Sequence, residues 1–161
     1  MAPGDAHGEL VHTGYMGNPP VLVEIDPQAG PAGAADRPLR DRDLQSLDRV
    51  IAAAEHATGL RFATFLGDLG DDTRATAERI VGQLGADAPY TVLVAISPGQ
   101  RVVEVVTGTE AARRVSDRAA RLGVLSVIAA AESGDLPRAL ENGVRVLADQ
   151  AGAAPNPTRG W

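Results

Sequence analysis

Three aspartates that lie close together have a residue type and a spacing that could bind a cation. Asp68, Asp71 and Asp72 stand in the segment DLGDDT, shortly after the predicted strand Leu60–Leu66. Clustered carboxylates, together with backbone carbonyls, are typical ligands of a hard cation such as calcium. Ligands of open α/β sheets also bind at the carboxyl ends of parallel strands, where we expect this segment to lie. The spacing matches no EF-hand loop, so the alternative interpretation is that Asp71 or Asp72 caps the helix that follows.

Four arginines form a second candidate site, in this case for an anion. They are Arg113, Arg114, Arg118 and Arg121. Guanidinium groups bind phosphate or carboxylate groups through paired hydrogen bonds. The last three share one face if the helix is continuous, but a helix break predicted near Val115 argues against that. The alternative interpretation is a solvated helix face, because all 15 basic residues of the chain are arginine.

No catalytic constellation is recognisable in the sequence. The chain has no cysteine, which excludes disulfides, thiolate metal sites and cysteine nucleophiles. It has no lysine, which excludes a Schiff-base lysine and a P-loop lysine. Glu104 stands among valines and is interpreted as an edge-strand charge or, alternatively, as a buried general base. We predict no catalytic residue, and a phosphatase with this sequence would need a metal-activated water.

Length and composition are those of one globular domain with tails. The chain has 161 residues, of which 44% are hydrophobic and 3% aromatic, so the core must be built from aliphatic side chains. The net charge of −6 repels phosphate backbones, and we predict no nucleic-acid partner. We find neither a signal peptide nor an apolar run of about 20 residues, as a membrane span requires. We therefore expect a cytoplasmic protein, either free or peripheral to a membrane.

The elements that must position these residues begin with a strand, a helix and a strand. The pattern predicts strands over 60–66 and 91–96 and a helix over about 72–84 between them. This is a βαβ unit, so the two strands should be parallel. The run 91–96 is continuously apolar, which is typical of a strand that is covered on both faces.

A hairpin is predicted directly after this unit. Ser97–Gln100 has the composition of a turn, and 101–106 follows as a strand antiparallel to 91–96 and nearer to an edge. We expect a type II turn, with Gly99 at a positive φ.

Helices before, between and after the strands imply layers on both faces of the sheet. The fold class is therefore α/β: a three-layer α/β/α sandwich with a small mixed central sheet. Asp135 suits the N-cap of the last helix, and Gly59 suits the end of the first. Besides 72–84, the predicted helical segments are 41–58, a short turn over 109–114, 117–132 (buried face Ala120, Val124, Ile128 and Ala131) and 137–151. Around this domain of 39–151, we predict a flexible segment over 1–38, with one strand at Val21–Ile25, and a disordered tail over 152–161.

These elements and several short motifs resemble the TPM domain family. The first helix exits through HATG, ending at Gly59, and the hairpin SPGQRVVEVVTG ends at Gly108. Ser116-Asp117 stands where the family often has an acidic residue that opens a helix, and GDLPRALENGVRVL resembles the closing turn and helix. The resemblance covers about residues 39–150 and looks like a stand-alone actinobacterial branch.

The resemblance implies a three-layer sandwich and two classes of function. Some TPM members are acid phosphatases or calcium binders, and others are assembly, repair or receptor-associated factors. By this resemblance Asp117 is a metal ligand, which would complete a calcium site with Asp68, Asp71 and Asp72 if the fold brings them together. The alternative is that Ser116 caps the helix and Asp117 lies in its first turn.

Two functional hypotheses follow from the sequence and the resemblance. The first, which we favour, is a non-enzymatic interaction or assembly module with a protein partner, such as an envelope or membrane complex. The second is a calcium-dependent acid phosphatase.

Overall fold

The computed structural model describes residues 7–11 and 39–154 of the chain, and these form a four-stranded sheet with helices on both faces. The sheet order is β1-β2-β3-β4. The elements, with η for a 3-10 helix, are β1 (His7–Val11), α2 (Asp41–Thr58), β2 (Arg61–Asp68), α3 (Thr73–Gly82), η2 (Gly85–Tyr90), β3 (Thr91–Ser97), β4 (Val102–Thr107), η3 (Ala111–Arg113), α4 (Asp117–Ala131) and α5 (Leu136–Ala151).

The sheet is mixed, as predicted. β2 and β3 are parallel and joined through α3, and β3 and β4 form the antiparallel hairpin. β1 adds a strand that we did not predict, antiparallel to β2 and at the edge of the sheet. The predicted strand Val21–Ile25 lies outside the described residues.

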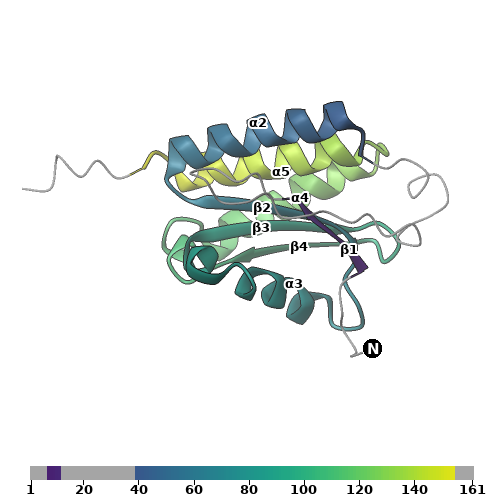
Figure 1. Cartoon of the computed structure of the whole chain (residues 1–161), viewed down its shortest axis with the longest axis horizontal. Helices are drawn as coiled ribbons and strands as arrows, with labels where there is room; N and C mark the ends of the chain where they lie inside the picture. Colours follow the sequence, from purple (N-terminus) through teal and green to yellow (C-terminus); the bar gives the residue numbers. More distant parts are fainter. Residues whose placement is uncertain (1–6, 12–38, 155–161) are drawn as a thin grey trace, which may run out of the picture.

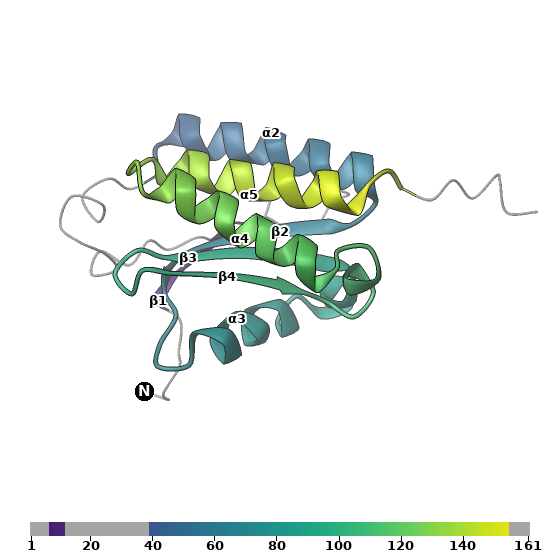
Figure 2. The same ribbon diagram turned by 180° about the vertical axis from the view of Figure 1, so that it is seen from behind.

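Among the described residues, α2, α4 and α5 cover one face of the sheet and α3 covers the other (Figure 1). α5 contacts both α2 and α4, so the layer runs α2-α5-α4, with α4 as its outer helix next to β4 (Figure 2). α3 lies on the opposite face, against β3 and β4. The predicted three-layer sandwich is therefore confirmed. None of the helices in the described residues is long and apolar enough to cross a membrane.

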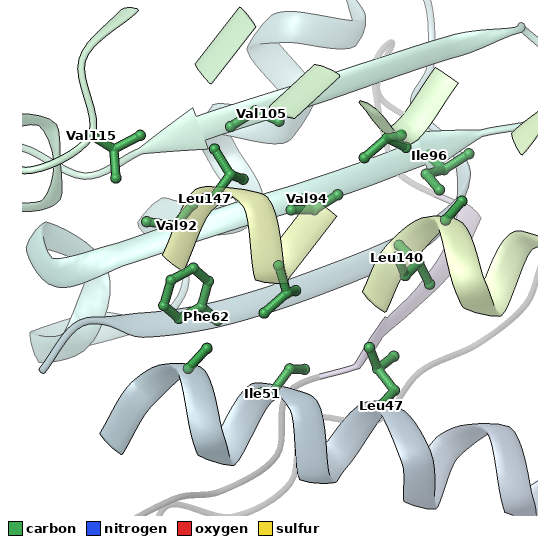
Figure 3. Close-up of a cluster of buried hydrophobic side chains, with 14 of the residues drawn as sticks. Leu47, Ile51, Phe62, Val92, Val94, Ile96, Val105, Val115, Leu140 and Leu147 are labelled. Carbon is green, nitrogen blue, oxygen red and sulfur yellow. The ribbon is translucent and has the colours of Figure 1, made fainter. Parts of the chain in front are cut away.

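The main core lies between the sheet and the three-helix layer (Figure 3). Alternate residues of β2 and β3, such as Phe62 and Val94, point into it and are fully buried. They meet Leu47 and Ile51 of α2 and Leu140 of α5.

A smaller cluster joins the other face of the sheet to α3. Every residue of β3 is buried, as expected for a strand that is covered on both faces.

The hairpin turn differs from the predicted type II turn. Gly99 does not have a positive φ; instead Arg101, the last residue of the turn, is left-handed with φ 55°. The amide of Arg101 donates to the carbonyl of Pro98 at 3.2 Å, so the bend spans Pro98 to Arg101. Four-residue hairpin loops close in this way, with the twist taken up at the final position. Our prediction assigned the positive φ to Gly99, two residues before Arg101, because glycine is the usual residue at a positive φ.

The buried face of α4 matches the prediction in part, because Ala120, Val124 and Ala131 are partly buried against the main core. Ala119, Gly123 and Val127 are buried, whereas Ile128 of the predicted face is 39% exposed. The reason is a close approach to α5. A side chain on Gly123 would place its Cβ 2.8 Å from Leu147, so the two helices touch along a stripe of small residues that hydrophobicity alone does not identify.

Candidate functional site

The Asp68–Asp72 loop lies where we expected, at the carboxyl ends of β2 and β3, and its side chains serve its own backbone. The Oδ1 atom of Asp68 accepts a hydrogen bond from the amide of Gly70 at 3.1 Å. The Oδ1 atom of Asp72 accepts one from the amide of Ala75 at 3.0 Å, and Asp72 is the N-cap of α3. Asp71 is exposed. The capping interpretation of Asp72 is confirmed, and it fills one of the acceptor positions that a cation would need.

Gln100 joins this loop to the hairpin, a role that we did not predict. Its Oε1 atom accepts from the amide of Leu69 at 2.8 Å and from the hydroxyl of Ser97 at 2.6 Å. Its Nε2 atom donates to the carbonyl of Gly70 at 2.7 Å. Because the bonds to Leu69 and Gly70 reach about thirty residues along the chain, no local pattern indicated them. One amide side chain thus links the hairpin to the loop at the carboxyl ends of β2 and β3.

Glu104 belongs to the same end of the molecule and also has a structural role. One carboxylate oxygen accepts from the hydroxyl of Thr73 at 2.7 Å, and the other lies 3.6 Å from the guanidinium group of Arg74. These contacts tie β4 to the first turn of α3. Neither alternative that we considered for Glu104 included this link.

Asp117 lies at the opposite end of the sheet from Asp68. Thr107, at the end of β4, pairs with Val92 near the start of β3, and α4 begins on that side after η3. Ser116 is the N-cap of α4, with its Oγ atom 3.1 Å from the amide of Ala119. Asp117 is exposed in the first turn.

The structure therefore does not bring Asp117 to Asp68, Asp71 and Asp72. Within residues 7–11 and 39–154, no group of three or more histidine, cysteine, aspartate or glutamate side chains could hold a metal ion. A calcium ion at the loop alone stays a prediction.

The four arginines of the predicted anion site have different surroundings. Arg114 donates to the carbonyl of Thr58 at 2.9 Å and to those of Gly152 and Ala153 at 2.9 and 3.0 Å, so it joins the carboxyl ends of α2 and α5. Arg113 lies 3.8 Å from Glu110 and is otherwise exposed. Arg118 and Arg121 are exposed on α4.

The contacts of Arg114 have two consequences. Its guanidinium group is occupied by carbonyls, so the predicted anion site loses its central member. Residues Gly152–Ala154, which we assigned to a disordered tail, are held in place: the amide of Ala154 donates to the carbonyl of Ala57 at 2.9 Å. Residues 155–161 lie outside the described part.

A buried carboxyl that we did not single out lies near the same end of the sheet as Asp117. Glu55 is 3% exposed, and its Oε2 atom lies 3.1 Å from the amide of Phe62 and 3.3 Å from Nε of Arg61. Its Oε1 atom has no hydrogen-bond partner within the described residues. Burial raises the pKa of Glu55 from 4.5 to about 7, outweighing the lowering by the Phe62 amide and the Arg61 guanidinium.

Glu55 can take up a proton near neutral pH, but it is closed to substrates. It continues the buried stripe of Leu47 and Ile51 at a spacing of four residues, which is the pattern that could have revealed it. We assign it a structural role.

The outer face of α4 exposes a row of large hydrophobic side chains. In the part of the chain that the structure describes, four large hydrophobic side chains are exposed. Three of them lie on α4: Leu122 (45%), Leu125 (62%) and Ile128 (39%). Their spacing of three residues keeps them on one side of the helix. We call this surface, which also carries Arg118, Arg121, Ala129 and Glu132, the α4 face. It offers no catalytic group, but it can bury apolar area against a partner.

Known proteins resemble this chain in sequence and in fold. Residues 28–148 match the family model described as "Domain of unknown function (DUF5130)". The uncharacterized protein Rv2468c of Mycobacterium tuberculosis strain H37Rv is 41% identical over 118 residues, which are 73% of this chain and 69% of that protein. The uncharacterized protein MT2543 of strain CDC 1551 matches to the same extent.

A solved structure has a similar fold. The solution NMR structure of the N-terminal domain of the cg2496 protein from Corynebacterium glutamicum has a TM-score of 0.58, covering 73% of this chain and 80% of that one. The sequences are only 10% identical, so the likeness concerns the fold alone.

Proposed function

This chain belongs to the DUF5130 family, and we propose that it is a TPM-like, non-enzymatic interaction module that binds a protein partner through the α4 face. The observation that carries the proposal is the row of Leu122, Leu125 and Ile128, exposed on consecutive turns of one helix. Single exposed apolar residues need no explanation, whereas a contiguous apolar patch marks an interaction site.

The position of α4 in the fold also supports this proposal. α4 is one of the two outer helices of its layer, and α5 and β4 contact its inner side. Its inner face is fixed by Ala119, Gly123 and Val127, so the outer face is held on a rigid element. A partner therefore meets a preorganised surface and loses little conformational freedom on binding.

The alternative function, a calcium-dependent phosphatase, has less support from the geometry. Asp117 and the Asp68–Asp72 loop lie at opposite ends of the sheet. A metal-activated water needs several ligands around one point. Assaying the purified protein with 4-nitrophenyl phosphate and calcium or magnesium tests this alternative. Robust turnover that Asp117→Ala abolishes would overturn the interaction proposal.

Photo-crosslinking in intact actinobacterial cells tests the proposal directly. A photoreactive amino acid at position 125 should form discrete covalent products, because Leu125 lies at the centre of the α4 face. The same amino acid at position 78, an exposed site on α3, should not form them. The substitution Arg121→Glu, at the rim of the face, should reduce the products at position 125. Identical products from both positions, or none at 125, would refute the proposal.

A further inference from the structure

We propose that the α4 face binds a second copy of this chain, through an antiparallel pairing of the two α4 helices about a two-fold axis at Leu125. This inference rests on the proposed function, because it names the partner of the same surface. It is carried by the order of residues along the face, which is self-complementary about Leu125.

The apolar residues of the face fit this arrangement. In an antiparallel pair with two-fold symmetry, each residue comes level with the residue that lies equally far along the helix on the other side of the axis, and residues on the contact line then face each other. Leu125 meets its own counterpart at the axis, and Leu122 and Ile128, about one turn before and after it, flank this contact on its two sides. All three are exposed in the single chain.

The charged residues fit the same axis. Arg118 and Glu132 are each seven residues from Leu125, or about 10.5 Å along the helix. The two-fold axis brings Arg118 of one copy opposite Glu132 of the other, twice per dimer. A parallel pairing in register would instead bring like charges together, which is unfavourable.

The isolated helix does not explain these two charges. Arg118 lies in the first turn of α4 and Glu132 is its C-cap, and each charge has the sign that the helix dipole disfavours at that end. Among the described residues no ion pair engages either side chain. Both charges become favourable when an antiparallel copy supplies the opposite charge.

A single pair of helices makes a small interface, so we expect a reversible dimer. Sedimentation equilibrium of the full chain should show an average mass that rises towards the dimer between about 10 µM and about 1 mM. Leu125→Glu should abolish the rise because it buries two like charges at the axis. Leu125→Ser changes no charge and should weaken association as well.

Charge exchange tests the register. Arg118→Glu and Glu132→Arg should each weaken the dimer by about tenfold, because each places like charges opposite one another twice. An equal mixture of the two variants should associate again, since every pair in the heterodimer is then of opposite sign. The matched control Arg49→Glu, an exposed arginine on α2, should associate like the wild type.

The outcomes separate this inference from the proposed function. Both charge variants favour the helix dipole, so their melting temperatures in dilute solution should equal or exceed that of the wild type. A wild-type chain that stays monomeric at 1 mM, or a mixture that fails to associate, would overturn the inference. Crosslinks from position 125 to a different protein would then still support the proposed function, whereas crosslinks with twice the mass of the chain support both.

Discussion

Glu55 belongs to the last turn of α2, and its carboxylate is buried against the start of β2, where an apolar side chain would be expected. Its neighbours satisfy only part of its charge: one oxygen meets the Phe62 amide and the Arg61 guanidinium, and the other has no hydrogen-bond partner in the described residues. The folded protein therefore favours the neutral acid. Between pH 4.5 and about 7, the folded state keeps a proton that the unfolded chain has lost.

The contribution of Glu55 to stability should consequently fall as the pH rises. It is largest below pH 4.5, declines through about pH 7 and is constant above. We compare the free energy of unfolding of Glu55→Gln with that of the wild type. From pH 5 to pH 8 the difference should shift by about 2–3 kcal/mol in favour of the variant, because the amide carries no charge to be desolvated. Urea unfolding at both pH values measures this. The control is Glu78→Gln at an exposed site on α3. Its free energy of unfolding should change with pH as that of the wild type does.

Arg114 is held by backbone carbonyls that lie far from it in the sequence. Its guanidinium group donates to Thr58, Gly152 and Ala153, at the carboxyl ends of α2 and α5. Cationic donors stabilise such ends through hydrogen bonds and the helix dipole. We expect Arg114→Ala to lower the free energy of unfolding by about 2–3 kcal/mol and to speed hydrogen exchange at the Ala154 amide.

The neighbouring Arg113 is a matched control for this prediction. Its side chain is 78% exposed and has one long ion pair with Glu110. Arg113→Ala should change the stability by no more than about 0.5 kcal/mol. Equal effects of the two substitutions would contradict the role that we assign to Arg114.

At the scale of the elements, the contact between α4 and α5 depends on glycine. A Cβ atom at Gly143 would lie 2.6 Å from Val127 and 3.1 Å from Val94. Gly143→Ala should therefore cost about 1–3 kcal/mol, since strain in a packed core outweighs the better helix propensity of alanine. Gly82 is also helical but has no atom within 4 Å of a Cβ, so Gly82→Ala should be neutral or slightly stabilising. Thermal unfolding of both variants tests the difference.

The elements that could be predicted from the sequence are those specified by neighbouring residues. α2 begins and ends as expected, because Gly59 takes the left-handed conformation that ends a helix. The caps at Asp72 and Ser116 were predictable for the same reason. β1 was not, since no pattern in His7–Val11 indicated a partner.

The candidate sites were harder to predict because they depend on distances across the fold. Asp68 and Asp117 lie at opposite ends of the sheet, and the sequence around each residue does not show at which end it lies. Gln100 and Arg114 act on backbone groups about thirty or more residues away. The exposure of the α4 face could not be predicted for a related reason. The small residues of α4 contact α5, so Leu122 and Leu125 point outward.

At the scale of the whole molecule, the two core clusters and the N-terminal strand make separate contributions. All described core residues lie between Leu39 and Ala151. β1 adds five residue pairs to the outer side of β2. β2 would be an edge strand without it, and exposed edge strands promote association between chains.

A chain of residues 39–154 should therefore fold but lose what β1 provides. We expect a native-like circular dichroism spectrum and cooperative unfolding, with a stability lower by a few kcal/mol, because each ladder hydrogen bond contributes about 0.5–1.5 kcal/mol. Hydrogen exchange should speed up at alternate residues of β2, whose amides then face solvent, while the amides of β3 and β4 stay protected. An unfolded product would mean that the N-terminal segment belongs to the folding unit. Unchanged exchange in β2 would mean that pairing with β1 contributes nothing to its protection.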